Sequence, residues 1–470
     1  MKGLINGIFP RSEVPSIWII ILGTILIIPI TLVLGAISNN VLKAAVLVLI
    51  PLLILFFFNF KLSFSFLVLL LFADVHRYGF AAVEYFSIFL LLSFFVNYNN
   101  IEIKDFKSPV FLFFVIFLMS CIPSIITTEV LPHVLYKLLH LVVFLILITI
   151  CVAAFSQQAG IFQFFKLFIF LSLINSLYLI YEAVITKSRT FGFAGVMFVD
   201  YVGIAIVVVF IWFLLSGIQK KIFLLPILLI LILASVFTQT RNSWISIVIL
   251  ILLILSFFYF HSRRYELNKR FLLVITLLMS ISIGGVYSYL KGVTPSVSER
   301  VEQFSETNNE VVNQKGEVTS SLISRLFIWD TALNAFTYNP VTGVGIYGFP
   351  YISWKYYKIP KIFFNNYVVS RTPHIAYLAI ATEAGIIGLI GYLLFIFSII
   401  KFSYQSIKLS KSHRDNLLSI VLFFCIIYIT VSMLMTDAWL WNQGIVLWGI
   451  ILSLSMVNRK ILLERYSSET

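Results

Sequence analysis

Long apolar runs separated by short polar segments make up most of the chain. Many of these runs reach about 17 residues or more, which is enough to cross a hydrocarbon core about 30 Å thick. Two runs, Leu62–Val75 and Ile445–Val457, are shorter, so each is expected to be a short span, a re-entrant segment or part of a neighbour. The pattern predicts an all-α fold, a polytopic transmembrane bundle of about 12–14 helices.

One long polar stretch, Lys291–Pro373, interrupts this apolar pattern. Its first half is polar, whereas apolar residues recur in its second half at helical spacing. The spacing predicts an amphipathic helix that lies on the membrane surface or caps the bundle. Its apolar face consists of Leu322, Leu326, Trp329, Leu333 and Phe336.

The glycine-rich segment NPVTGVGIYGFP follows that helix. A phosphate-binding loop is one interpretation, but no Lys-Ser/Thr pair follows the glycines, so a turn is favoured. The expected organisation is one integral domain in three parts. These are an N-terminal transmembrane bundle (1–290), an extracytoplasmic loop with short amphipathic helices (291–373) and C-terminal transmembrane helices (374–470).

Basic residues set the expected orientation of the bundle. They gather in alternate connections, above all in His261–Arg270 and Lys401–Arg414. This bias predicts that both termini are cytoplasmic and that the Lys291–Pro373 loop faces outward. The N-terminal sequence lacks the form of a cleavable signal peptide, so its apolar run is expected to stay as the first helix.

The composition excludes a soluble protein. Hydrophobic residues make up 60% of the chain and charged residues 11%, and the mean hydropathy is +1.03. The net charge of +13 is typical of basic cytoplasmic loops, so nucleic-acid binding is not expected. Cys121, Cys151 and Cys425 fall in apolar runs and are interpreted as core residues rather than as a disulfide or metal set.

The end of the polar loop carries the first candidate for chemistry. In RTPHIAYLAIATEAGIIGLIGYLLF, Thr372 suits a helix cap and Pro373 a first turn, which places His374 in that turn at the membrane surface. The following helix carries Glu383 and a small-residue stripe that lets another helix approach closely. The stripe is Gly385, Gly388 and Gly391.

His374 has two interpretations. It is either an interfacial histidine with a structural hydrogen bond or a general base. A helix N-terminus and nearby arginines both lower the pKa of a histidine, which keeps it neutral and able to accept a proton. Glu383 lies about two and a half turns further on and is expected to support the bundle interior or an arginine rather than catalysis.

Three arginines depart from the charge bias, because Arg77, Arg189 and Arg241 fall in short outer loops or at helix ends. Lipid phosphates or a carboxylate partner explain each of them alone. With His374 on the same side, Arg189 and Arg241 also fit a shared anionic site, since two guanidinium groups hold a diphosphate in bidentate fashion without a metal. The sequence has neither a zinc-type His/Cys cluster nor an Asp-x-Asp pair, so no metal and no cofactor are expected.

Three stretches carry a family pattern: TQTRNSWIS, SRLFIWDTALNAFTYNPVTGVGIYGF and HIAYLAIATEAGIIGLIGYL. A fourth, SRTFGFAGVMFVD, is similar to an earlier arginine loop of the same family. In order and spacing the chain resembles the O-antigen ligase and O-antigen polymerase superfamily of bacterial envelope enzymes. Two positions depart from the family pattern: Ile375 follows His374 where Asn or Ser is common, and Thr240 precedes Arg241 where Ser is common.

The resemblance implies a metal-independent, inverting glycosyltransferase in the bacterial inner membrane. Its donor would be an oligosaccharide or polysaccharide on undecaprenyl diphosphate at the outer face, and membrane lipids would surround it. The expected function is polymerisation of O-antigen or surface-polysaccharide repeat units, within lipopolysaccharide biosynthesis for the cell envelope. The acceptor would then be another lipid-linked glycan, and a chain-length regulator protein is an expected partner. The alternative is an O-antigen ligase, whose acceptor is lipid A-core.

Carried over to this sequence, the resemblance implies that Arg189 and Arg241 bind the diphosphate and that His374 activates the acceptor hydroxyl. Secondary candidates, the first two as further anion contacts, are Arg325, Arg371, Glu383 and Arg77. A protein O-oligosaccharyltransferase of the same superfamily and a lipid-linked oligosaccharide flippase are further alternatives. The flippase predicts short loops on both sides and weak internal symmetry, which the long polar loop and the lack of visible repeats disfavour.

Overall fold

The computed structural model describes residues 60–72, 86, 90, 94, 108–155, 157–186, 190–270, 272, 321–410, 412–437 and 444–469. It divides the chain into two units, Met1–Leu71 with Val75–Ile101, and Phe72–Asp74 with Glu102–Thr470. In the first unit the structure describes one helix, α4 (Phe60–Leu71), which overlaps the predicted short segment Leu62–Val75. The second unit holds every feature discussed below. The predicted three-part division at 290 and 373 stays a prediction.

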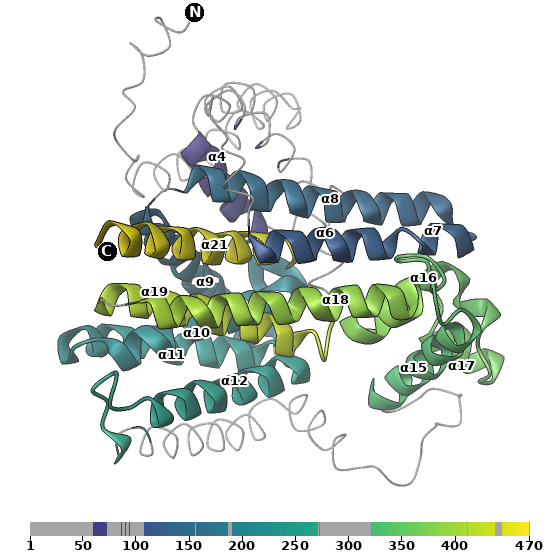
Figure 1. The fold of residues 1–470 in the computed structure, drawn as a ribbon. Coiled ribbons are helices and arrows are strands. Elements are labelled where there is room, and N and C mark those ends of the chain that lie inside the picture. Colours follow the sequence, from purple (N-terminus) through teal and green to yellow (C-terminus); the bar gives the residue numbers. More distant parts are fainter. Residues whose placement is uncertain are drawn as a thin grey trace, which may run out of the picture. The chain divides into compact units, whose positions relative to one another are not determined.

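Within the described residues, all regular secondary structure is helical (Figure 1). Nine helical stretches there are long and apolar enough to cross a membrane, which confirms the predicted all-α polytopic fold. The helices are α6 (Pro109–Cys121) with α7 (Ser124–Thr127), α8 (Leu131–Ala154), α9 (Gln158–Thr186), η3 (Gly192–Met197) with α10 (Phe198–Leu215), α11 (Ile218–Phe237), α12 (Arg241–Phe260), α18 (Ala376–Leu409), α19 (His413–Ser432) and α21 (Gly444–Glu469).

Short connections make successive helices run back and forth, so the bundle has two ends (Figure 1). At one end, the backbone N–H of Ala376 at the start of α18 donates to the carbonyl of Met433 just beyond α19, at 3.0 Å. At the other end, Arg264 beyond α12 donates to the carbonyl of Ser410 beyond α18, at 3.2 Å. We call the first the loop end, because the helices of the polar loop lie there, and the second the opposite end.

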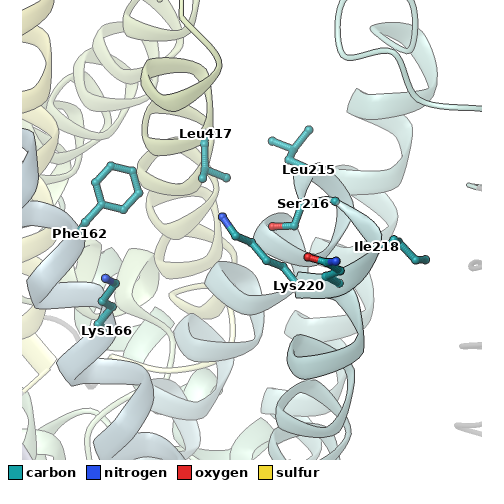
Figure 2. Close-up of a pocket in the computed structure, with 9 residues that line it drawn as sticks. Phe162, Lys166, Leu215, Ser216, Ile218, Lys220 and Leu417 are labelled. Carbon is teal, nitrogen blue, oxygen red and sulfur yellow. The ribbon is translucent and has the colours of Figure 1, made fainter.

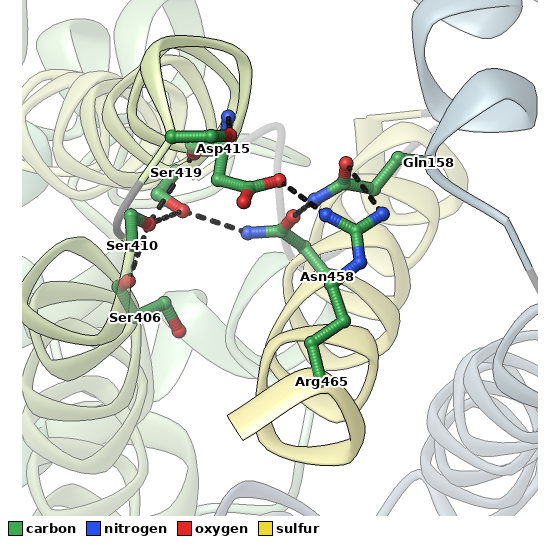
Figure 3. A network of polar contacts seen from close by, with 8 residues as sticks. Gln158, Ser406, Ser410, Asp415, Ser419, Asn458 and Arg465 are labelled. Carbon is green, nitrogen blue, oxygen red and sulfur yellow. Dashed lines mark hydrogen bonds and ion pairs between the residues drawn. The ribbon is translucent and has the colours of Figure 1, made fainter. Parts of the chain in front are cut away.

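The opposite end holds a pocket between α9, the α10–α11 turn and α19 (Figure 2). Beside it, a polar network joins helices that are distant in sequence (Figure 3). Gln158 on α9 donates to Asn458 on α21 at 3.1 Å, and Asn458 donates to Ser419 on α19 at 2.9 Å. Arg465, near the end of α21, donates to Asp415 at 2.9 Å.

The network explains the length of the last helix. The predicted short segment Ile445–Val457 is wrong, because α21 continues to Glu469 and has 26 residues. Asn458 and Arg465, which ended the apolar run in the sequence, have side-chain partners on α19. A buried polar group is tolerated where it is hydrogen-bonded, so the helix continues past its apolar part.

The longest of these helices, α18, is broken where the polar loop meets it. Gly385 has φ 66° and ψ −167° in the middle of the helix. The backbone N–H of Ile386 donates to the carbonyl of Pro340 in the loop, at 2.8 Å. A Cβ on Gly385 would lie 2.2 Å from the carbonyl oxygen of Val341, so both the conformation and the space require glycine. The polar loop is thus hydrogen-bonded into a membrane helix.

Two further predictions about glycines are confirmed. The NPVTGVGIYGFP segment turns, since the N–H of Gly343 (φ 73°) donates to the carbonyl of Asn339 at 2.9 Å. The small-residue stripe of α18 admits a neighbour, because a Cβ on Gly391 would lie 2.3 Å from Ser120 Oγ on α6.

The described part of the polar loop forms α15 (Ser321–Tyr338), α16 (Phe349–Ile352), η4 (Ser353–Lys355) and α17 (Lys361–Tyr367). The predicted helix is confirmed, but a different face of it packs inward. Its buried face is Ile328, Ala332 and Ala335, whereas Leu326 and Leu333 are 48% and 51% exposed. The small alanines let α15 approach α18 closely, and Thr382 donates to the carbonyl of Ala332 at 3.2 Å.

Candidate functional site

His374 lies in a bend between the polar loop and α18. The helix begins at Ala376, so the prediction that His374 lies in its first turn is wrong. His374 has φ 58°, a left-handed conformation that a right-handed helix does not contain. The preceding carbonyl, that of Pro373, accepts a hydrogen bond from Trp329 Nε1 of α15 at 2.9 Å. The loop helix therefore holds the bend that positions the histidine.

Asp437 faces the imidazole of His374. Its Oδ1 lies 3.9 Å from His374 Nδ1, within ion-pair range but too far for a direct hydrogen bond. The histidine side chain is 40% exposed and the aspartate 7% exposed. Among the described residues, Asp437 Oδ2 has no hydrogen-bond partner. A buried carboxylate oxygen of this kind suits a place that a polar substrate or water enters.

Arg325 brings a positive charge from α15 to the same place. Its Nη1 donates to Asn242 Oδ1 at 3.0 Å. Asn242 is itself fixed, because its Nδ2 donates to a backbone carbonyl beyond α19 at 2.8 Å. Asn242 directly follows Arg241 in the chain, and the guanidinium of Arg325 is close enough to interact with the charges of Asp437 and His374.

These surroundings set the charge of the histidine. Burial lowers the pKa of His374 below its usual value. Asp437 raises that pKa, while Arg325 and Arg371 lower it, and the net shift is downward. His374 is therefore neutral at neutral pH and able to accept a proton. The predicted direction of the pKa shift and the predicted contribution of arginines agree with this, but burial, rather than a helix N-terminus, is the largest cause.

The structure describes less of the other predicted arginines. Arg241 starts α12 as expected, and the structure describes its backbone only. Arg371 is exposed and donates to a backbone carbonyl of α17 at 3.2 Å. Arg189 and Arg77 lie outside the described residues. The structure thus gathers His374, Arg325 and the neighbour of Arg241 at the loop end.

Glu383 occupies a separate position inside α18. Its side chain is fully buried, and its Oε2 accepts a hydrogen bond from the backbone N–H of Tyr347 at 2.8 Å. Tyr347 has φ 56°, and Lys137 Nζ lies 4.2 Å from the centroid of its ring. Burial raises the pKa of Tyr347 to about 12, so the phenol stays protonated. In this arrangement Glu383 holds the glycine-rich segment against the bundle.

Two residues of the cluster were not among the predicted site residues. Asp437 lies just beyond an apolar run. The sequence shows its charge at that position but not the residue that it faces. Asn242 lies inside the TQTRNSW motif, in which the prediction singled out Arg241 alone. In both cases a polar residue lies at the edge of a membrane helix, which marks it as a candidate. Whether it belongs to a site depends on which other helix ends lie beside it.

The fold and the cluster define a multi-pass membrane protein with a charged site where a polar loop covers one end of the bundle. The model of the O-antigen ligase family matches residues 226–393, which run from α11 to the middle of α18 and include Arg241, Arg325, His374 and Glu383. The match supports the resemblance of the chain to the O-antigen ligase and polymerase superfamily. No curated protein matches the chain.

The matching family indicates a general chemistry for the site. The family supports a glycosyltransferase-like enzyme of the O-antigen ligase or polymerase type, active in a membrane on a lipid-linked glycan and an acceptor. Among the described residues there is no group of three or more His, Cys, Asp or Glu that could hold a metal ion.

Proposed function

We propose that this protein transfers a glycan from undecaprenyl diphosphate to an acceptor hydroxyl, and that it polymerises surface-polysaccharide repeat units. The observation that carries the proposal is the cluster of His374, Arg325 and Asp437 at the loop end. It combines a neutral base, a fixed guanidinium and a buried carboxylate at one surface of a membrane bundle. A base that takes the acceptor proton and a cation that stabilises the leaving diphosphate are groups that such a transfer reaction uses.

The diphosphate is proposed to lie between Arg189 and Arg241. Arg241 starts α12 beside Asn242, which already holds Arg325. The start of α10, which follows Arg189 in the chain, belongs to the loop end, because Ser432 at the end of α19 donates to a carboxylate in the first turn of α10, at 2.9 Å. Guanidinium groups match phosphate oxygens in bidentate fashion, which supports a metal-independent clamp.

The proposed chemistry is an in-line displacement with inversion. The acceptor oxygen forms a bond to the anomeric carbon as the bond between that carbon and the diphosphate oxygen breaks. His374 takes the hydroxyl proton, and the electron pair leaves with the diphosphate, whose charge the arginines stabilise. With Nδ1 turned toward Asp437, Nε2 is the proposed proton acceptor. Asp437 then stabilises the imidazolium that forms.

The reaction is proposed to take place at the outer face of the inner membrane, with both termini cytoplasmic. Basic residues at the opposite end, such as Arg264 and Arg465, support this orientation. Single cysteines at Ser305 and Ser412, in place of serine, test it with an impermeant reagent in outer-membrane-permeabilised cells. Labelling at 305 alone is expected, and labelling at 412 alone would reverse the orientation and the side of the donor.

Polymerase and ligase share the donor and differ in the acceptor. Ile375 after His374, where the family often has Asn or Ser, supports polymerase, whereas the description of the matching family, O-antigen ligase, supports the ligase. Purified protein is incubated with lipid-linked repeat units, with and without lipid A-core, and the products are separated on a gel. A ladder without lipid A-core supports polymerase, a product only with lipid A-core identifies a ligase, and no product in either arm overturns the proposal.

A further inference from the structure

A pocket of about 770 Å³ lies at the opposite end of the bundle. Residues of α9, of the α10–α11 turn and of α19 line it (Figure 2). A volume of this size is within the range of small-molecule sites and holds a lipid headgroup with the first part of its chains. Glycan transfer, as proposed above, does not use this place.

One wall of the pocket is apolar. Phe162 from α9, Leu215 from α10 and Leu417 from α19 contribute to it. The ring of Phe162 lies 6.3 Å from that of Trp212. Tryptophan in membrane proteins concentrates at the level of the lipid headgroups. The apolar wall therefore suits the upper part of an acyl chain.

The other side of the pocket is positive. Lys166 of α9 and Lys220 of α11 line it, and the side chain of Lys220 extends toward Leu417 (Figure 2). Helix α11 also begins there. The residue before it, Gly217, has no side chain that could cap the N–H groups of the first turn. The first-turn N–H groups of a helix favour a negative charge.

No carboxylate opposes this positive charge among the residues that line the pocket. Asp415, two residues before Leu417, is held by Arg465 at 2.9 Å on the neighbouring network. Two lysines beside an apolar wall match the two parts of an anionic phospholipid.

We propose that this pocket binds one phospholipid with a net anionic headgroup. Its phosphate lies between Lys166 and Lys220, and one acyl chain follows Phe162 and Leu417. The site is independent of the proposed glycan transfer at the loop end.

The test measures binding of the first lipid to the purified full chain by native mass spectrometry. The probes are phosphatidylglycerol and phosphatidylcholine with the same acyl chains, added to delipidated protein. The wild type is expected to prefer phosphatidylglycerol. The double variant Lys166→Ala/Lys220→Ala should bind phosphatidylglycerol about thirtyfold more weakly, because each lysine near an anionic lipid contributes about fivefold, and its binding of phosphatidylcholine should not change.

The matched control is Lys401→Ala/Lys408→Ala, which removes two charges from the same end of the bundle but outside the pocket, and it should bind as the wild type does. Leu417→Trp keeps both lysines and narrows the pocket at its apolar wall, so it should weaken binding of both lipids and also serves if the alanine variant misfolds. Equal binding of both lipids to the wild type, or equal loss in the control, would overturn the proposal. So would displacement of the lipid by millimolar inorganic phosphate, which would identify a free phosphate site.

Discussion

The carboxylates at the two ends of the bundle have different surroundings. At the opposite end, Gln158, Asn458 and Ser419 satisfy one another inside the protein, and Asp415 is paired with Arg465 (Figure 3). At the loop end, Asp437 is buried with a carboxylate oxygen that has no hydrogen-bond partner among the described residues.

Backbone conformation follows the same division. Of the described non-glycine residues with positive φ, the loop end holds Gln239, Tyr347, Ser370 and His374, whereas the opposite end holds Glu266 alone. Such conformations cost free energy and persist where the surrounding structure imposes them. The comparison teaches that the opposite end pairs its carboxylate inside the protein. Among the described residues, the loop end instead keeps a buried carboxylate oxygen without a hydrogen-bond partner and most of the strained backbone conformations, and the proposed site rests on these features.

Loss of the base should give the largest effect at the loop end. His374→Ala is expected to lower glycan transfer about 10²-fold or more, the usual range for general base catalysis, because no group takes the acceptor proton. The protein should still insert and bind the lipid-linked donor. The measurement is product formed from purified protein and lipid-linked donor.

A glutamine at this position separates a base from a structural hydrogen bond. His374→Gln retains hydrogen-bonding ability but cannot take a proton, so it should be as inactive as the alanine variant. Near-normal product from the glutamine variant would mean that His374 only positions the start of α18.

The arginine clamp should give the next largest effect. Arg241→Lys and Arg189→Lys should each lose about tenfold or more in activity although the charge remains, because lysine lacks the bidentate fork. Arg263→Lys, at an exposed arginine just beyond α12 at the opposite end, is the matched control and should change little. Activity should also survive EDTA. Full activity in both lysine variants would remove the diphosphate clamp from the mechanism.

The electrostatic setting of His374 should appear as opposite shifts in pH dependence. Activity needs the neutral imidazole, so it rises with pH through the pKa of His374. Asp437 raises that pKa, so Asp437→Asn should move the acid limb of the pH–rate profile to lower pH. Arg325 lowers the pKa, so Arg325→Gln should move the limb to higher pH. Shifts in the same direction in both variants would contradict this assignment.

The smallest effect on activity is expected at the opposite end. Arg465→Ala removes the partner of Asp415 and should lower stability by about 0.6–2 kcal/mol, measured as a lower thermal midpoint in detergent. The rate of glycan transfer at a temperature where the variant is folded should not change. A fall in the rate of the folded variant, with no change in the thermal midpoint, would contradict the assignment of stability to the opposite end and of glycan transfer to the loop end.

Local patterns gave much of the fold and part of the site. The length and apolarity of each run determine the membrane helices, and the position of Arg241 at the start of α12 followed from the end of one run and the beginning of the next. His374 was recognisable as a polar residue at the edge of a span. These properties depend on residues within a few turns of one another, which is why the sequence alone determined them.

Contacts between distant segments decided the rest. Trp329 holds the carbonyl of Pro373, so His374 sits in a bend rather than in a helical turn. Asp437 and Asn242 reach the site only because the ends of α19 and α12 meet beside α15. Periodicity marks which residues of a helix share a face, but it does not say which partner that face meets. That choice depends on how closely backbones approach, and only the tertiary structure fixes it.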